Sequence, residues 1–573
     1  MPIHNTDIAK IFNKMADLLE IEGANQFRVR AYRNAARTVA GHGENLAGLV
    51  KEGKDLSKLP GIGKSMVEKI KEIADSGALS QLQELEGRVP PDLSGLMHLS
   101  GLGPKRVQAL YRELGVETIG DLREAAGKKK IRELEGFGEK TEEKLLREAE
   151  RADHQEKRFK LVTVEEQVIS LEENLNKVKG VKNITMAGSY RRRKETVGDL
   201  DILATCEKSS RVMDRFTQYE DVVQVIAKGK SRSSVVLRSG LQVDLRVVPQ
   251  VSYGAALHYF IGSKGHNIAI RKLGQQKNLK INEYGVFKGE KRVAGKTEKE
   301  IYRKVGLDYI EPELRENRGE IEASKAKRLP SLISLEDIRG DLHAHTKETD
   351  GRHTLDEMAE EARNRGYEYL GITNHSKKVT VAKGLDAKKL AEEIENIDRL
   401  NDKLDDFLIL KSIEVDILQD GSLDLPGDIL KELDSTVCSV HYNLNLSQEK
   451  QTERIIRAMD NPYFHILGHP SGRLINERAP YEVDMERLMD AAKEKGCFLE
   501  LNAHPDRLDL NDVYCKMAKD KGIKVVISTD AHSVTDLDLM RFGVWQGRRG
   551  WLEPDDVLNT RSWEEIKKMI RRK

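Results

Sequence analysis

The sequence has only four cysteines in 573 residues, and no two of them lie close together. Cys206, Cys438, Cys497 and Cys515 form no CxxC pair, so neither a disulfide framework nor a cysteine zinc site is expected. No apolar run reaches the roughly 18 residues that a membrane-spanning helix needs. The N-terminal segment also lacks the basic and then apolar layout of a signal peptide. We therefore expect a protein of the reducing cytoplasm with no membrane segment.

The net charge of +1 conceals an uneven distribution along the chain. Residues 1–335 carry a net charge of +12 and residues 336–573 a net charge of −11, which predicts two halves with different functions. The basic bias is strongest in 222–282, where ten Lys and Arg accompany a single acid, Asp244. A basic surface around one carboxylate favours a phosphate-rich ligand.

A Gly-apolar-Gly turn that opens a helix occurs three times near the N-terminus. The copies are LPGIGKSMVEKI at 59–70, LSGLGPKRVQAL at 99–110 and LEGFGEKTEEKL at 134–145. Glycine lets backbone N–H groups approach a phosphate, and the helix that follows presents its positive end. The repeat predicts helix-hairpin-helix DNA binding, and glycines that merely cap helices are the alternative. The candidate DNA contacts are Gly61, Gly63, Lys64, Lys69, Gly101, Gly103 and Lys105.

Two carboxylates follow each other on one strand in AGSYRRRKETVGDLDIL, residues 187–203. Asp199 and Asp201 are two residues apart and so point to the same face, and Asp244 in LQVDLRVV offers a third carboxylate. Three converging carboxylates repel one another unless divalent cations neutralise them, so we expect two Mg²⁺ ions that clamp a triphosphate. The Gly188–Ser189 turn is expected to bind its phosphates. A surface hairpin with exposed aspartates is the alternative.

Nine of the fifteen histidines follow residue 340, where apolar strand runs alternate with helical stretches. A parallel (βα)7 barrel is predicted from seven strand runs, at 338–343, 369–373, 408–414, 435–440, 464–468, 497–502 and 524–529. Imidazoles and carboxylates fall at the strand ends, where such barrels carry their chemistry. The candidate metal ligands are His343, His345, Asp350, His375, Glu414, His441, His469, Asp530 and His532. This set suits Zn²⁺, Mn²⁺ or Fe²⁺, and a purely structural metal cluster is the alternative.

The motifs GSYRRRKETVGDLDIL, QVDLRVVP, YFIGSKGHNIAIR and INEYGVF resemble the palm and nucleotide-binding subdomain of DNA polymerase beta and its family X relatives. The resemblance extends over residues 1–316. It implies catalytic metal ligands at Asp199, Asp201 and Asp244. It implies nucleotide contacts at Gly188, Ser189, Arg192, Tyr259, Phe260, Gly262, Lys264 and Asn267.

The same resemblance assigns more specific roles to the segment after the palm. Tyr259 and Phe260 would lie under the sugar and discriminate against a ribose 2′-hydroxyl. Asn267 would contact the edge of the incoming base or sugar. Arg271 would contact the template strand, and Tyr284 would also contact DNA.

The sequence departs from the family pattern at two places, at Lys264 and around Lys69. Lys264 stands where the vertebrate enzyme has an acid, and a cation there would hold nucleotide before DNA arrives. Lys69 aligns with the Schiff-base lysine of the beta-type lyase, yet supporting lysines are replaced by residues such as Ser65 and Arg28. A solvated lysine that touches a DNA phosphate is therefore the favoured interpretation of Lys69.

Residues 336–573 resemble the polymerase and histidinol phosphatase (PHP) domain, in which a trinuclear metal site is implied. One metal would be held by His343, His345, Glu414 and Asp530. A second would be held by Glu414, His441 and His469, and a third by Asp350, His375 and His532. Since every ligand position is filled, we expect an active phosphoesterase with up to three Zn²⁺ or Mn²⁺ ions.

The sequence therefore predicts a multidomain protein of α+β and α/β parts. The expected domains are 1–87 (lyase-like, helix-hairpin-helix), 88–155 (helix-hairpin-helix), 156–249 (nucleotidyltransferase palm), 250–316 (nucleotide-binding subdomain), 317–335 (linker) and 336–573 (PHP barrel). The expected function is gap filling in base excision repair by a monomer that uses dNTPs and gapped or primer-template DNA. The PHP part would act as a 3′–5′ exonuclease, AP endonuclease or 3′-phosphatase. A DNA-end scaffold and a nucleotidyltransferase with a non-DNA acceptor are the alternatives.

Overall fold

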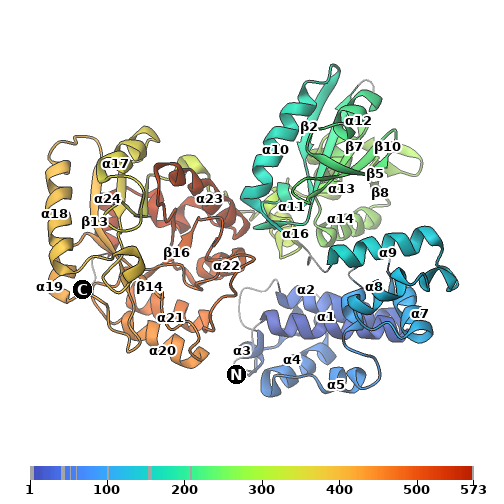
Figure 1. Cartoon of the computed structure of the whole chain (residues 1–573), viewed down its shortest axis with the longest axis horizontal. Coiled ribbons are helices and arrows are strands. Elements are labelled where there is room, and N and C mark those ends of the chain that lie inside the picture. The colour runs from blue at the N-terminus through green and yellow to red at the C-terminus, as the bar shows by residue number, and fades with distance from the viewer. Residues whose placement is uncertain are drawn as a thin grey trace. The chain divides into compact units, whose positions relative to one another are not determined.

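The computed structural model divides the chain into two compact units, Met1–Lys157 and Arg158–Lys573 (Figure 1). It describes residues 5–40, 46–51, 53–59, 61–97, 99, 102–152, 158–206 and 209–570. Within these residues, no helix is both long and apolar enough to span a membrane.

The first unit is built from helices joined by short turns. Its helices are α1 (Asn5–Glu22), α2 (Gln26–Ala40), α3 (Leu46–Lys51), α4 (Lys64–Ser76), α5 (Ser80–Glu86), α6 (Leu93–Leu96), α7 (Pro104–Leu114), α8 (Ile119–Gly127) and α9 (Glu139–Ala152). Their apolar faces share one core, in which Phe12 on α1 packs edge-on against Tyr32 on α2 at 5.7 Å between ring centroids. Burial of these stripes, rather than helix propensity alone, holds such short helices together.

A mixed five-stranded sheet begins the second unit, in the order β2-β4-β7-β6-β5. Its strands are β2 (Val181–Met186), β4 (Asp199–Cys206), β5 (Val222–Lys228), β6 (Arg232–Leu237) and β7 (Gln242–Val247). A short pair of strands, β1 (Phe159–Lys160) and β3 (Thr196–Val197), and the helices α10 (Leu161–Asn176), α11 (Gly188–Arg191) and α12 (Ser209–Thr217) complete this region. Strands β4 and β7 are parallel, whereas the other neighbours are antiparallel.

A smaller helical region with a three-stranded sheet follows. Its elements are α13 (Tyr253–Ile261), α14 (Lys264–Gln276), β8 (Lys280–Asn282), β9 (Gly285–Lys288), β10 (Lys291–Ala294), α15 (Glu298–Val305) and α16 (Glu320–Lys325). Residues from these elements form a separate apolar core. Replacement of Gly254 by a residue with a side chain would disturb this region, because a Cβ there would lie 2.3 Å from the Thr297 backbone.

Most of the segment 317–335, which its charged composition predicts to be a linker, has no regular secondary structure. It contains α16, whose first residue, Glu320, is fully buried. The Glu320 carboxylate accepts hydrogen bonds from the backbone N–H groups of Asn317 and Arg318 and lies 2.7 Å from His266 Nδ1. A sequence pattern places such a charge in solvent, whereas the Glu320 carboxylate has buried partners here.

The predicted seven-stranded parallel barrel is confirmed, with the strand order β11 to β17. The strands are β11 (Gly340–Ala344), β12 (Tyr369–Ile372), β13 (Leu408–Asp416), β14 (Ser435–Ser439), β15 (Ile466–Leu467), β16 (Phe498–Asn502) and β17 (Val525–Ser528). The helices are α17 (Leu355–Asn364), α18 (Ala387–Asn401), α19 (Gly427–Leu430), α20 (Gln448–Ala458), α21 (Met485–Lys495), α22 (Asp512–Lys521), α23 (Met540–Arg549) and α24 (Trp563–Ile570). A parallel bridge from Ala344 to Ala531 joins the first strand to the last.

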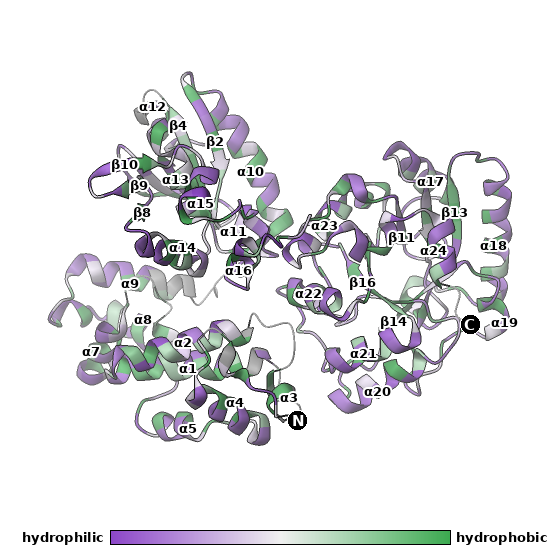
Figure 2. Cartoon of the chain, turned by 180° about the vertical axis from the view of Figure 1, so that it is seen from behind, coloured by the Kyte–Doolittle hydropathy of each residue, from purple (hydrophilic) through white to green (hydrophobic). Residues whose placement is uncertain are grey.

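Burial explains why the barrel strands read as continuous apolar runs. All five residues of β11, β14 and β16 are buried, because parallel strands are covered on both faces. Figure 2 shows mostly hydrophobic residues on β13 and many hydrophilic residues on the neighbouring α18. The ends of the strands converge on one mouth of the barrel, where βα-barrels place their functional side chains.

Candidate active sites

The parallel register of β4 and β7 brings the three aspartates together. Asp201 pairs with Asp244 across the two strands, and Asp199 shares a face with Asp201. Burial, with the nearby charges of Asp199 and Asp244, raises the pKa of Asp201 to about 7. Three converging carboxylates are a suitable ligand set for hard divalent cations.

The Gly188–Ser189 turn passes directly beside this acidic cluster. Gly188 has a φ of +60°, and a Cβ on it would lie 2.7 Å from Asp201 Oδ2. Both its conformation and the lack of space therefore require glycine. The backbone N–H of Ala187 donates to the carbonyl of Asp201 at 2.8 Å, which fixes the turn to β4.

A cavity of about 550 Å³ opens over the aspartates and brings together all eight residues predicted to contact nucleotide. These are Gly188, Ser189, Arg192, Tyr259, Phe260, Gly262, Lys264 and Asn267, and Arg271 joins them. Tyr284 does not line this cavity; it lies in the turn between β8 and β9 and is 59% exposed. The sequence interpretation missed Arg158, Lys194 and Ser263, although the run RRRK contained a signal for Lys194.

Hydrogen bonds orient several of these side chains before any ligand binds. Arg192 Nε donates to Glu316 at 3.0 Å, and its guanidinium also donates to the carbonyl of Ile261. Asn267 Nδ2 donates to the carbonyl of Tyr259 at 2.7 Å, whereas its buried Oδ1 has no partner among the residues that the structure describes. The unpaired oxygen is available to a donor on a bound molecule.

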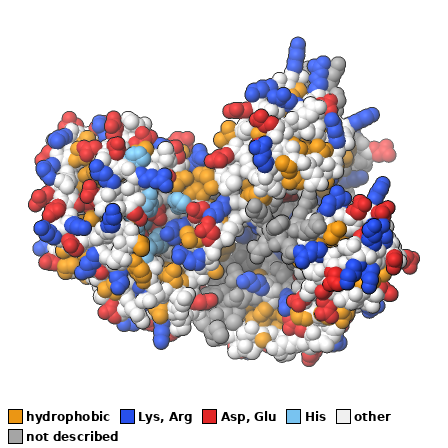
Figure 3. Space-filling model, in the orientation of Figure 1, with side chains coloured by type: hydrophobic (Ala, Val, Ile, Leu, Met, Phe, Trp, Pro, Cys, Tyr) orange, Lys and Arg blue, Asp and Glu red, His pale blue; other side chains and the backbone are white. Residues whose placement is uncertain are grey.

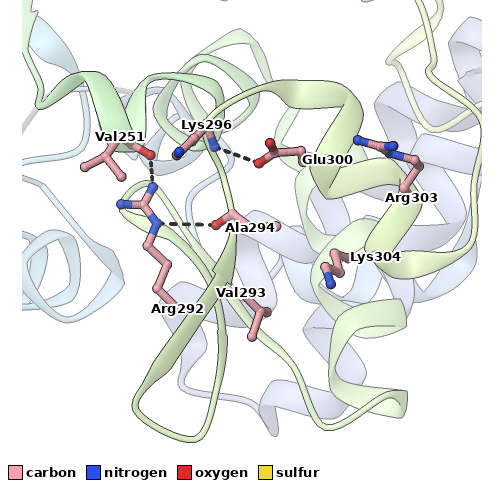
Figure 4. Close-up of a pocket in the computed structure, with 8 residues that line it drawn as sticks. All are labelled: Val251, Arg292, Val293, Ala294, Lys296, Glu300, Arg303 and Lys304. Atoms are coloured by element: carbon pink, nitrogen blue, oxygen red, sulfur yellow. Dashed lines mark hydrogen bonds between the residues drawn. The ribbon is translucent and has the colours of Figure 1, made fainter.

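A second cavity, of about 640 Å³, lies between β10 and α15 (Figure 4). Lys296, Arg303 and Lys304 line it together with Arg292, which donates to the carbonyls of Val251 and Ala294. None of these residues belongs to the predicted sites. The basic lining continues the positive bias that the sequence shows in this half of the chain.

The barrel brings all nine predicted metal ligands into one cluster around Glu414. Its carboxylate lies within 4 Å of five imidazoles, with the shortest distances 2.8 Å to His375 Nδ1 and 3.0 Å to His469 Nε2. Three sets have ligand atoms within 4.8 Å of one another: His345 with Asp350, His375 and His532; His343 with His345 and Asp530; and His375 with Glu414 and His441. Figure 3 shows histidine side chains gathered on one face of this part.

The chemistry of this cluster fits bound metal ions. Within the described residues, the Nδ1 atoms of His345 and His469 are buried without a hydrogen-bond partner. An unpartnered buried nitrogen costs free energy unless an ion or ligand occupies its lone pair. Divalent transition metals bind well to sites where several imidazoles surround carboxylates.

Two further carboxylates, which the sequence interpretation missed, orient the histidines from outside. Glu500 is fully buried and lies 2.6 Å from His343 Nδ1, while Asp416 lies 3.2 Å from His441 Nδ1. Such contacts fix the tautomer that presents Nε2 to a metal. Asp416 was detectable, because it stands two residues after Glu414 on the same strand.

In the first unit, all three glycine turns begin helices as predicted, and Gly138 of the third turn directly precedes α9. Gly63 precedes α4 and Gly103 precedes α7, so Lys64 and Lys105 lie in the first turns of these helices. Gly61 has a φ of +82°, and Gly101 lies outside the described residues. Lys69 Nζ donates to Ser65 Oγ at 2.9 Å on the exposed side of α4.

Family comparisons agree with this organisation. Four family models match: a helix-hairpin-helix domain at 3–79, a tandem helix-hairpin-helix at 93–151, the DNA polymerase beta palm at 161–253 and the DNA polymerase beta thumb at 256–316. The fold and the aspartate site thus define a protein of the DNA polymerase beta class, extended by a PHP-like barrel.

The chain belongs to the PolX family, because it is 38% identical over 575 residues to the DNA polymerase/3′-5′ exonuclease PolX of Bacillus subtilis, and the match covers 100% of both chains. A probable phosphatase of Thermoanaerobacter sp. is 32% identical over 235 residues, which are 38% of this chain and 89% of that protein. A probable phosphatase of Clostridium acetobutylicum is 30% identical over 203 residues.

Proposed function

We propose that this protein is a DNA-directed DNA polymerase that fills short gaps, with a 3′–5′ exonuclease in its barrel. The observation that carries the proposal is the register of β4 and β7, which aligns Asp244 with Asp201 beside a cavity that Asp199, Asp201 and nucleotide-binding residue types line. The similarity to the Bacillus DNA polymerase/3′-5′ exonuclease supports both activities. The test is incubation of the full-length protein with a labelled gapped duplex. The primer should be extended when dNTPs are present and shortened when they are absent.

In the polymerase site, Asp199, Asp201 and Asp244 would hold two Mg²⁺ ions. When bound, the cations neutralise phosphate charge and lower the cost of deprotonating the primer hydroxyl. By the family resemblance, Asp244, which lies on β7 opposite Asp201 of β4, would receive that proton. Ser189 and Arg192 would hold the triphosphate through charge-assisted hydrogen bonds.

The remaining cavity residues would select and orient the substrates. Tyr259 and Phe260 pack edge to face, with ring centroids 5.1 Å apart, and form a rigid floor for the sugar. Asn267 offers its unpaired Oδ1 to the incoming nucleotide, and Arg271 and Tyr284 would contact DNA. The helix-hairpin-helix turns would bind DNA phosphates without sequence preference.

Replacement of Lys264 by alanine is expected to weaken dNTP binding in the absence of DNA roughly tenfold. Lys264 is exposed, opens α14 and lines the nucleotide cavity, so its ammonium can meet the triphosphate before DNA arrives. Equilibrium binding of Mg²⁺–dNTP to the DNA-free protein measures the effect. Lys272→Ala, on the same helix but outside the cavity, is the matched control, and equal affinities for all three proteins would refute the role.

In the barrel, the nine ligands would hold up to three Zn²⁺ or Mn²⁺ ions, which when bound supply Lewis-acid activation for phosphoester hydrolysis. Glu414, at the centre of the cluster, would bridge two of them. Glu500 and Asp416 would hold His343 and His441 in the required tautomers. Besides exonuclease activity, the same chemistry supports AP endonuclease and 3′-phosphatase reactions on DNA ends.

The Glu500→Gln variant is expected to bind Zn²⁺ about 10–100-fold more weakly than the unchanged protein. The neutral amide oxygen accepts the His343 Nδ1–H bond more weakly than the carboxylate does, so it stabilises less the tautomer that leaves Nε2 free. Competition with a chromophoric chelator measures the affinity without any enzymatic assay. Asp434→Asn is the control, because Asp434 binds the Lys411 N–H at the opposite end of the barrel strands; a similar loss in both variants would contradict the role.

A further inference from the structure

The barrel supports the back of the turn that would bind the triphosphate. We call residues 188–195, which follow β2, the phosphate turn. Within it, the Arg193 guanidinium lies 3.7 Å from the ring centre of Trp545, and the Glu195 carboxylate pairs with Arg473 at 2.7 Å. Both partners belong to the barrel region, and Figures 1 and 2 show its helix α23 beside α11.

Arg549, the last residue of α23, makes the most direct of these contacts. It is only 5% exposed, and its Nη1 donates to the carbonyl of Arg192 at 2.7 Å. The same nitrogen lies 3.2 Å from Glu316 Oε1, to which Arg192 Nε donates at 3.0 Å. Arg549 therefore fixes Arg192 at two points. It binds the Arg192 backbone directly, and it binds the Glu316 carboxylate that orients the Arg192 side chain.

The geometry of Arg549 is itself fixed by the barrel. Its Nη2 donates to Asp512 at 2.6 Å, and Asp512 also pairs with Arg318 at 3.0 Å. Although burial opposes ionisation, the charges of Arg549, Arg192 and Lys194 lower the pKa of Glu316 to about 2. The carboxylate is thus ionised at neutral pH and forms a buried bridge between the two arginines.

We infer that Arg549 is a positioning residue of the polymerase site, which sets the Arg192 guanidinium for the triphosphate from the PHP-like barrel. The barrel then supports the nucleotide site structurally and also contains its own metal site. This inference rests on the proposed polymerase function. Because Arg549 lies behind the turn and does not line the cavity, its effect is on nucleotide binding rather than on the chemical step.

The test compares full-length Arg549→Ala with the unchanged protein on a one-nucleotide gap. We expect KM for dNTP to rise about tenfold while kcat stays within about twofold, since uniform binding is lost. The Kd for dNTP, measured on a dideoxy-terminated gapped duplex, should rise equally. Glu316→Gln should reproduce both changes, and the double variant should add little, because the two residues act in one network.

Arg548→Ala is the matched control. Arg548 precedes Arg549 on α23 and pairs across the same boundary with Glu313 at 2.7 Å, but it does not contact Arg192. Its KM and Kd should match those of the unchanged protein. Unchanged values in Arg549→Ala, or an equal rise in Arg548→Ala, would overturn the inference.

Two further measurements separate the other outcomes. Thermal unfolding shows whether Arg549→Ala is folded; if it is not, Glu316→Gln decides the question, and an unchanged Kd in that variant overturns the inference. If the unchanged protein fails to extend primers, the proposed function fails. The dNTP Kd values then still decide whether Arg549 positions the phosphate turn.

Discussion

Primer extension by the full-length protein is expected to fall by about a thousandfold or more when Asp199 and Asp201 are both replaced by alanine. The double substitution leaves Asp244 as the single carboxylate of the trio, so two Mg²⁺ ions lose most of their ligands. Since about 1.4 kcal/mol corresponds to a tenfold change in rate, loss of several kcal/mol of charge stabilisation accounts for this magnitude. Extension of a labelled gapped duplex in the presence of dNTPs measures it.

The shortening activity of the same variant should be retained, because the barrel ligands are untouched. Asp214→Ala is the control, since Asp214 is exposed on α12 and pairs only with Lys228 among the contacts of the described chain. That variant should extend normally. Near-normal extension by the double variant would exclude the aspartates from catalysis.

The raised pKa of Asp201, about 7, also gives this site a pH signature. A carboxyl whose pKa is higher in the folded than in the unfolded protein destabilises the fold once it ionises. Stability of the metal-free protein should therefore fall as the pH rises through the interval between the ordinary value and about 7. Asp201→Asn should reduce this dependence, to which other buried carboxyls such as Glu320 contribute, and raise the unfolding temperature at pH 8 in a chelator.

The complementary variant, His343→Ala with His345→Ala, should lose 3′–5′ shortening by about a thousandfold or more while it extends primers normally. Both imidazoles are fully buried and contact Asp530, at 3.6 Å and 3.1 Å. Their removal takes two ligands from the centre of the cluster. The rate of shortening without dNTPs and the bound metal content should fall together.

His353→Ala is the control for this prediction. His353 lies outside the cluster, and its Nδ1 accepts a hydrogen bond from the backbone N–H of Val534. It should keep both its metal and its activity. If the double variant continued to shorten DNA with its metal lost, the hydrolytic site would have to lie elsewhere in the chain.

Much of both sites was predictable because it depends on local pattern. Alternation along a strand placed Asp199 and Asp201 on one face, and the periodic return of apolar runs predicted seven barrel strands with ligands at their ends. The burial of Glu320 beside His266, within the segment 317–335, was not predictable in this way. A prediction from composition places such a charge in solvent, because composition contains no information about a buried partner that is distant in sequence.

The sequence by itself determined the kinds of element and the kinds of ligand, since periodicity and donor chemistry are properties of neighbouring residues. Only the tertiary structure decided that Asp201 faces Asp244, that Glu414 lies among five imidazoles and that Arg549 holds Arg192. These relations join residues separated by tens to hundreds of positions. They arise from strand register, barrel closure and the packing of the barrel against the palm, each of which depends on the whole fold rather than on any local segment.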